Sequence, residues 1–122
     1  MSETAEITMY LFVNTDLGMK PGKVAAQTCH VTRKITDEII RSGYESNKIP
    51  ESYLTYIKWI NDGEKKITLK ATEAQLRELI KEEDSYHVID AGRTQIAPNS
   101  LTVVGFKPSN KLSEKFKDYK LY

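Results

Sequence analysis

The apolar positions in the first half of the chain follow two different periods, and each period predicts a different element. Residues 7–13 form a short run of apolar, β-branched and aromatic residues that stops at a polar turn, as a buried strand does. Beyond Pro21, which suits the first turn of a helix, the apolar positions recur in steps of three and four. They predict a helix that faces the core through Val24, Thr28, Val31, Ile35 and Ile39.

A second helical piece is predicted after a polar, turn-rich stretch at residues 42–50. Gly63 closes this piece, and its apolar side consists of Tyr53, Tyr56, Ile57 and Ile60. Residues 66–71 predict the next strand. Thr72, with Gln75 three residues later, forms a capping-box pattern that starts a third helix.

The last third of the chain predicts two strands joined by a long connection. Residues 86–91 form one strand, and residues 101–106, apolar on both faces, form a central one. The connection at residues 92–100 is too long for a tight turn, and connections of that length are often functional. A short amphipathic segment at residues 109–119, with Leu112 and Phe116 four apart, follows.

The predicted order of elements, β-α-α-β-α-β-β-α, is that of an α/β protein. It implies a small mixed sheet with helices on both faces and right-handed crossovers. A chain of 122 residues has room for one hydrophobic core, so we predict a single domain over residues 1–122.

Composition narrows the classes of function. Lys and Arg number 18 and Asp and Glu number 17, so any contact with nucleic acid is confined to one face. The only cysteine, Cys29, and two separated histidines, His30 and His87, offer no metal-ligand spacing, so we expect no metal or cofactor and a reducing compartment. The chain start lacks a basic signal-peptide region, and the apolar stretch at residues 9–13 is far shorter than a membrane span. We therefore expect a cytoplasmic protein without membrane contact.

The first segment with candidate chemistry runs from Gly18 to His30, where a predicted strand leads into a helix. It imitates a nucleotide-binding P-loop, but only three residues separate Gly18 from the following Gly-Lys pair, and the next residue has no hydroxyl for magnesium. We therefore reject a P-loop nucleotide binder. Lys20 and Lys23 lie where exposed amides attract anions and the helix dipole disfavours cations, which indicates a bound anion. Two solvated loop lysines are the alternative.

A polar stripe continues along the same helix. Lys23, Gln27, His30 and Lys34 follow one another at steps of four, three and four, which places them on one face. Taken alone, the stripe is also explained as a solvated outer face. Cys29 and His30 are adjacent, so their side chains diverge by about 100° and do not easily form a nucleophile–base pair.

The second segment runs from Asp90 to Thr102. Asp90 ends an apolar strand, where desolvation or a neighbouring charge can tune a carboxylate, and Arg93, Thr94 and Gln95 add donors just beyond it. A turn in which the polar side chains only cap the backbone is the alternative. No Gly-x-Ser-x-Gly elbow supplies a serine nucleophile, so acid–base chemistry on water is the remaining route for an esterase.

Together the two segments resemble the type II peptidyl-tRNA hydrolases of archaea and eukaryotes. In that family a strand leads into Gly-Lys-x-Ala-Ala-Gln-x-x-His, here residues 22–30. A later stretch reads Asp-Ala-Gly-Arg-Thr-Gln-Ile-Ala-Pro-x-Ser, here residues 90–100. The resemblance covers nearly the whole chain, because it extends to Trp59, Lys70-Ala71 and the terminal Lys120-Leu121-Tyr122.

The resemblance implies a three-layer α/β/α fold with a four-stranded mixed sheet, and metal-independent hydrolysis of the ester that joins a peptide to tRNA. Peptidyl-tRNA is the implied partner, and the implied role is recycling of tRNA from stalled translation. The catalytic candidates carried over by position are Lys23, Asp90 and Thr102, with Gln27, His30 and Thr94 near them. The candidates for tRNA binding are Lys20, Lys34, Arg93 and Gln95.

Roles follow from the chemistry of these side chains. We assign Asp90 to orienting or deprotonating the attacking water, and Lys23 to the developing oxyanion or a neighbouring phosphate. Thr94 and Thr102 are assigned as hydrogen-bond donors.

The chain departs from the family pattern at two places. Val31 and Thr32 stand where small residues are usual, and residues 42–53 form a longer stretch than is typical. A non-catalytic interaction domain that keeps the fold is the main alternative, because fold does not imply activity. Such a domain is expected to have lost polar motif residues, and here the matched ones are present. The sequence leaves open whether the protein is a homodimer.

Overall fold

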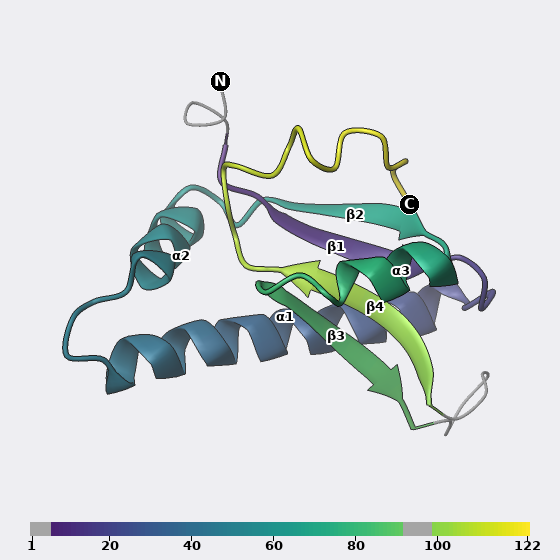
Figure 1. The fold of residues 1–122 in the computed structure, drawn as a ribbon, viewed down its shortest axis with the longest axis horizontal. Helices are drawn as coiled ribbons and strands as arrows, with labels where there is room; N and C mark the ends of the chain where they lie inside the picture. Colours follow the sequence, from purple (N-terminus) through teal and green to yellow (C-terminus); the bar gives the residue numbers. More distant parts are fainter. Residues whose placement is uncertain (1–5, 92–98) are drawn as a thin grey trace.

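The computed structural model describes residues 6–91 and 99–122, and its centre is a four-stranded sheet (Figure 1). The elements in chain order are β1 (Met9–Asn14), α1 (Pro21–Glu45), α2 (Glu51–Asn61), β2 (Lys66–Ala71), α3 (Glu73–Leu79), β3 (Ser85–Asp90) and β4 (Ser100–Phe106). The strand order is β2-β1-β4-β3; β1 and β2 are parallel, and β4 is antiparallel to both of its neighbours. The sheet is therefore mixed, as expected.

Helices cover both faces of the sheet and make three layers. Residues of β1 alternate between the two cores: Met9, Leu11 and Val13 pack with α1 and α2, whereas Tyr10 and Phe12 pack with α3 and the C-terminal segment. Figure 1 shows α1 behind the sheet and α3 in front of β4. The three-layer α/β/α prediction is confirmed.

The long helix α1 starts at Pro21 as predicted but differs from its prediction at its C-terminal end and at one core position. It begins at Pro21 and runs to Glu45, so the first four residues of the stretch expected to be a turn are helical. Gln27 is buried and Thr28 only half-buried, the reverse of the prediction. The Gln27 amide can be buried because it receives a hydrogen bond from β4, which the helical pattern does not reveal.

The predicted buried side of α2 is correct for Tyr53 and Tyr56, which pack against the core, but wrong for its two isoleucines. Trp59 is buried, whereas Ile57 and Ile60 are exposed. The large indole covers more of the core than an isoleucine, and its Nε1 donates to the Lys65 carbonyl at 2.8 Å. α3 starts as predicted, because Thr72 and Gln75 form both hydrogen bonds of a capping box.

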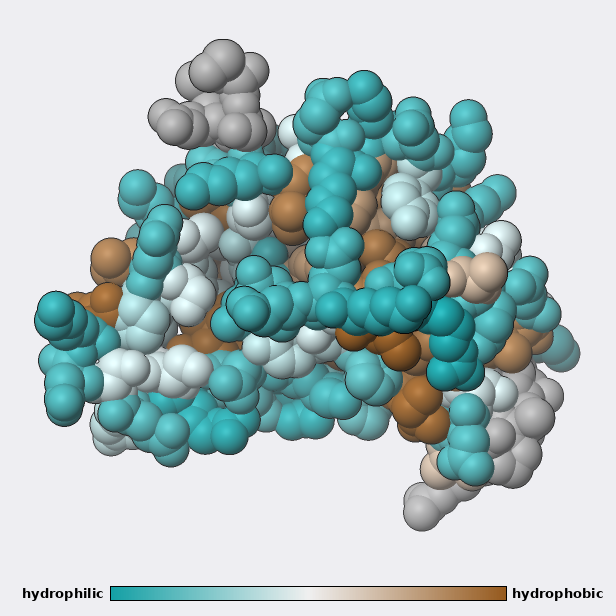
Figure 2. Space-filling view, in the orientation of Figure 1, coloured by the Kyte–Doolittle hydropathy of each residue, from teal (hydrophilic) through white to brown (hydrophobic). Residues whose placement is uncertain are grey.

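The C-terminal segment is a series of turns, where a helix was predicted. The amide of Phe116 bonds the Leu112 carbonyl with helical spacing, but the following bonds, from the amides of Lys117 and Tyr119, each span only three residues. Phe116 is nevertheless buried, with its ring 4.8 Å from that of Phe12. Figure 2 shows mainly hydrophilic side chains over this face, with apolar residues visible in the gaps between them.

Candidate active site

An ion pair joins the start of α1 to the end of β3. The Lys23 Nζ lies 2.6 Å from Asp90 Oδ1, and both side chains are only 9% exposed. Lys23 belongs to the first turn of α1, and Asp90 is the last residue of β3. The amide of Asn99, on the far side of the connection, donates to the Asp90 carbonyl at 2.7 Å and fixes the backbone there.

The carboxylate of Asp90 explains the lysine that stands against the helix dipole. The first turn of α1 contains no acidic residue, so the helix itself offers Lys23 no countercharge. The sequence indicated a bound anion at this end of α1. The Asp90 carboxylate, at the end of β3, is that anion. An external anion is not needed to account for Lys23.

A second polar contact lies one helical turn further along α1. The Thr102 hydroxyl of β4, which is fully buried, lies 2.7 Å from Gln27 Oε1 and 3.2 Å from the Val88 carbonyl oxygen. Both of these oxygens are acceptors, so the hydroxyl proton is directed toward them. Among the residues that the structure describes, no donor to the hydroxyl's own lone pairs is seen.

A β-bulge aims Thr102 toward α1. Pairing between β3 and β4 passes from Val88–Val103 directly to Ile89–Leu101, so Thr102 is the extra residue on β4. A bulge of this kind re-aims a side chain next to a functional site. Val88 and Asp90 are two residues apart on β3 and share its α1 face. The Thr102 and Lys23 contacts are therefore neighbours.

Together the two contacts supply a carboxylate that can accept a proton, an ammonium beside it, and a hydroxyl held in a fixed direction. This set can activate water and stabilise a developing negative charge. The Gln27 amide oxygen accepts the hydrogen bond from the Thr102 hydroxyl one helical turn along α1 from Lys23.

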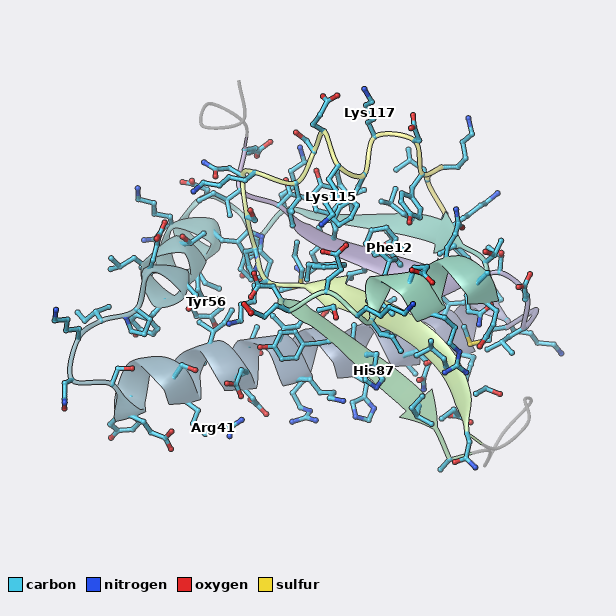
Figure 3. All side chains as sticks on the ribbon, viewed as in Figure 1. Phe12, Arg41, Tyr56, His87, Lys115 and Lys117 are labelled. Carbon is cyan, nitrogen blue, oxygen red and sulfur yellow. The ribbon has the colours of Figure 1, made fainter. Side chains whose placement is uncertain are left out.

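The remaining predicted residues are dispersed. His30 and Lys20 are exposed on and before α1. Lys34 is half-buried, and its Nζ donates to the His87 carbonyl at 2.7 Å, which ties α1 to the outer strand β3. Figure 3 shows His87 on that strand. Arg93, Thr94 and Gln95 lie outside the described residues, so their predicted roles stay predictions.

Sequence reasoning missed one polar residue beside the site. Asn14, read only as part of a turn, is buried at the end of β1 and makes three side-chain hydrogen bonds. A polar residue that ends a wholly apolar strand was the available signal. The bulge at Thr102 had no such signal, because it depends on the register between two strands.

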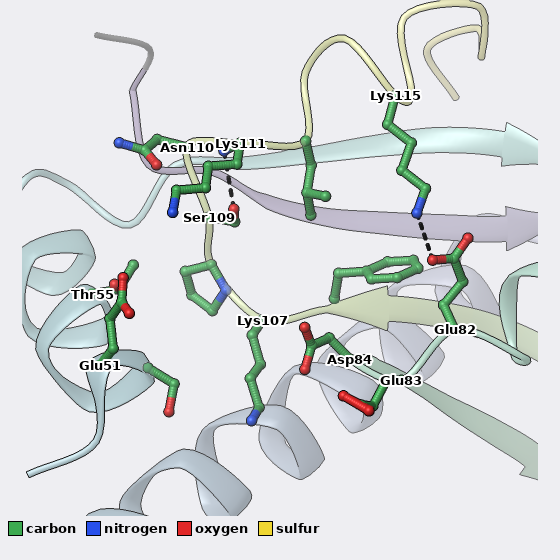
Figure 4. A pocket seen from close by; sticks show the side chains of 14 residues that line it. Glu51, Thr55, Glu82, Glu83, Asp84, Lys107, Ser109, Asn110, Lys111 and Lys115 are labelled. Atoms are coloured by element: carbon green, nitrogen blue, oxygen red, sulfur yellow. Dashed lines mark hydrogen bonds and ion pairs between the residues drawn. The ribbon is translucent and has the colours of Figure 1, made fainter. Parts of the chain in front are cut away.

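Within residues 6–91 and 99–122, no cluster of three or more His, Cys, Asp or Glu side chains could hold a metal ion. A hollow of about 410 Å³ lies at the other end of β3 and β4, near Phe106 and the residues before Ser85. Figure 4 shows lysines and acidic side chains lining it together, with Lys115 bonded to Glu82. It is separate from the Lys23–Asp90 pair.

Comparison with known proteins covers almost the whole chain. A sequence model of the family described as peptidyl-tRNA hydrolase PTH2 matches residues 7–122. The chain belongs to the PTH2 family. The PTH2 match includes both polar segments, so Lys23, Asp90 and Thr102 all lie inside it.

Named relatives of this PTH2 chain come from archaea and eukaryotes. A peptidyl-tRNA hydrolase of Methanococcus maripaludis is 38% identical over 119 residues, covering 91% of this chain and 95% of the relative. A peptidyl-tRNA hydrolase of Sulfurisphaera tokodaii is 34% identical over 109 residues, covering 83% and 84%. The peptidyl-tRNA hydrolase 2 of Saccharomyces cerevisiae is 40% identical over 129 residues, covering 96% of this chain and 59% of the yeast protein.

No helix in the described part of this PTH2 chain is long and apolar enough to cross a bilayer.

Proposed function

We propose that this chain is a peptidyl-tRNA hydrolase, which cleaves the ester between a peptide or N-blocked amino acid and tRNA. The observation that carries the proposal is the buried Lys23–Asp90 pair beside the Thr102 hydroxyl, in a chain of the PTH2 family. The proposed place of action is the cytoplasm, where stalled translation leaves peptidyl-tRNA. Each copy of the chain contains both contacts, so the proposal does not require a homodimer.

The proposed reaction is attack of water on the ester carbonyl. Asp90 orients the water and accepts its proton as the oxygen bonds to the carbonyl carbon. The bond to the ribose oxygen then breaks, and that oxygen takes the proton that Asp90 had accepted. The second proton of the water leaves the new carboxyl group to solvent, so the products are a carboxylate and a free tRNA hydroxyl. General-base catalysis of this kind typically contributes about 100- to 10,000-fold.

Lys23 is proposed to change partners during the reaction. In the free protein its ammonium neutralises Asp90 at 2.6 Å. The tetrahedral intermediate places a new negative charge beside the same ammonium, and a preorganised donor to such an oxyanion is typically worth about 100- to 1,000-fold in rate. Thr94 is proposed as a further donor, with His30 near the substrate. The Thr102 proton is directed to Gln27 Oε1, so Thr102 is proposed to take part as an acceptor held in place by Gln27, and not as the donor expected from the sequence.

The direct test is discharge of an N-acetyl-aminoacyl-tRNA by the purified chain. We expect first-order release of the N-blocked amino acid that survives exhaustive chelation, with monovalent salt and spermidine present to keep the tRNA folded. Binding of the tRNA without discharge would instead support the non-catalytic interaction domain. Activity lost on chelation and restored only by a transition metal would contradict metal-independent hydrolysis.

A further inference from the structure

Asn14 is a fully satisfied polar side chain inside the core, at the end of β1. Its side-chain Nδ2 donates to the Leu101 carbonyl at 2.8 Å and to Glu73 Oε1 at 2.7 Å. Its Oδ1 accepts from the Asp16 amide at 2.8 Å, and the residue is only 1% exposed. The partners fix the orientation of the amide, because a flipped side chain would face two acceptors with its oxygen.

The bond to Leu101 lies where the sheet is irregular. Backbone pairing between β1 and β4 ends at Val13–Val103, and the next residue of β4 is the bulged Thr102. Asn14 therefore reaches past the bulge with its side chain and holds the carbonyl of the residue just before it. Without this bond, the last link between β4 and β1 would be the backbone pairing at Val103.

The other two bonds tie the same amide to α3 and to the loop that leads into α1. Asn14 holds the Asp16 amide, and Asp16 Oδ2 in turn accepts from the Glu73 amide at 2.8 Å. Glu73 closes the network through its own bond to Asn14. One buried amide thus fixes β4 at Leu101, α3 at Glu73 and the start of the loop before α1.

We propose that Asn14 is a positioning residue for ester hydrolysis, which acts by holding the Leu101 carbonyl so that Thr102 keeps its direction toward Gln27. The inference rests on the proposed function. Asn14 itself lies on the β1 side of Leu101 and acts on the reaction only through Thr102. A misplacement of about 1 Å in a catalytic group can reduce turnover by about 100-fold.

Asn14→Asp tests the role with little change of shape. The new oxygen faces the Leu101 carbonyl and the Glu73 carboxylate, so both donated bonds are lost and repulsion replaces them. We expect kcat to fall about 10- to 100-fold with KM within about twofold, because no tRNA contact is touched. The matched control is Glu73→Gln, which keeps an acceptor for Asn14 and leaves the Leu101 bond intact, and it should retain wild-type kcat.

A double-mutant cycle with Thr102→Val separates positioning from general loss of structure. If Asn14 acts through Thr102, Asn14→Asp should lower kcat less than about threefold in the Thr102→Val background. All variants are assayed at a temperature where circular dichroism shows them folded. If the buried charge prevents Asn14→Asp from folding, the same cycle is run with Asn14→Ser, whose shorter side chain cannot span to Leu101.

The outcomes are distinct. An additive cycle, unchanged kcat in the folded Asn14 variants, or wild-type kcat in Thr102→Val overturns the inference while leaving the hydrolase proposal standing. An inactive wild-type protein overturns the proposed function and this inference with it.

Discussion

Within residues 6–91 and 99–122, no buried side-chain nitrogen or oxygen lacks a hydrogen-bond partner. The Lys23–Asp90 pair and the Thr102 hydroxyl are both removed from water, and each has a partner on a different element. Removing a charged group from water is costly, and good hydrogen-bond geometry offsets that cost only in part. Groups kept in such contacts are candidates for chemistry, because burial and charge together adjust their reactivity.

His87, on the edge strand β3, predicts a pH dependence of stability. Burial lowers the pKa of His87 below its ordinary 6.5, and the positive charges of Lys34 and Arg77 lower it further. The unfolded chain therefore binds the His87 proton at higher pH than the folded protein does. It follows that stability is lost as the pH falls below 6.5 and through the lowered pKa.

We expect His87→Gln to remove this part of the acid-side loss. The measurement is the urea midpoint of wild type and variant, about one pH unit above and below 6.5. The variant should lose less stability than wild type between the two pH values. Equal losses would show that His87 contributes nothing to the acid sensitivity.

At the residue scale the sequence proposed candidate site residues but not the contacts between them. Lys23, Asp90 and Thr102 followed from the two motifs, but the sequence did not pair Lys23 with Asp90. The two residues are 67 positions apart, and their contact depends on where β3 ends relative to α1. The sequence did not indicate the role of Asn14 either, because two of its hydrogen-bond partners lie 59 and 87 positions away in the chain.

At the scale of elements, strands and helices were predictable where local signals are strong. The capping box at Thr72 placed the start of α3, and the β-rich run at residues 66–71 matched β2. The C-terminal segment was predicted as a helix because Leu112 and Phe116 share a helical spacing. Its backbone instead pairs with the edge strand β2, where the Tyr122 amide donates to the Thr68 carbonyl at 2.9 Å.

The capping box itself predicts a stability change. Thr72 Oγ1 accepts from the Gln75 amide at 3.1 Å, and the Gln75 side chain accepts from the Thr72 amide at 2.9 Å. Thr72→Ala removes the first bond and should lower the free energy of unfolding by about 1 kcal/mol, as for N-caps in general. Chemical denaturation measures the change. Thr72→Ser is the matched control and should stay near wild type; equal stability of all three proteins would show that the cap is dispensable.

At the scale of the whole molecule, the net charge is near neutral, so we expect tRNA to bind a local basic surface. Lys34 is a poorer probe of that face than the sequence indicated, because its Nζ is bonded to the His87 carbonyl and its loss would also loosen α1 from β3. Lys20 is exposed just before α1, near the Lys23–Asp90 pair.

We expect Lys20→Ala to weaken tRNA binding and to flatten its salt dependence. Each phosphate contact contributes roughly 0.7 to 0.9 to the slope of log affinity against log salt, so the slope should decrease by about that amount. Fluorescence anisotropy with an uncleavable tRNA analogue measures it. Lys58→Ala, an exposed lysine on α2, is the control. A slope that changes equally in both variants would place the docking face elsewhere.

The central claim is that Asp90 activates water in ester hydrolysis, and Asp90→Asn tests it. The variant keeps the shape of the side chain but leaves the Lys23 ammonium buried without a charged partner. Breaking a buried pair in this way can cost up to about 3–5 kcal/mol, so discharge must be measured where circular dichroism shows the variant folded. The exposed Asp84, at the other end of β3, provides the matched control as Asp84→Asn.

The deciding measurement is the single-turnover rate of N-acetyl-aminoacyl-tRNA discharge by wild type, Asp90→Asn and Asp84→Asn. Each protein is in saturating excess over the same tRNA. The account predicts a loss of about 100- to 10,000-fold for Asp90→Asn and a wild-type rate for Asp84→Asn. A folded Asp90→Asn protein that discharges the tRNA at the wild-type rate would contradict it.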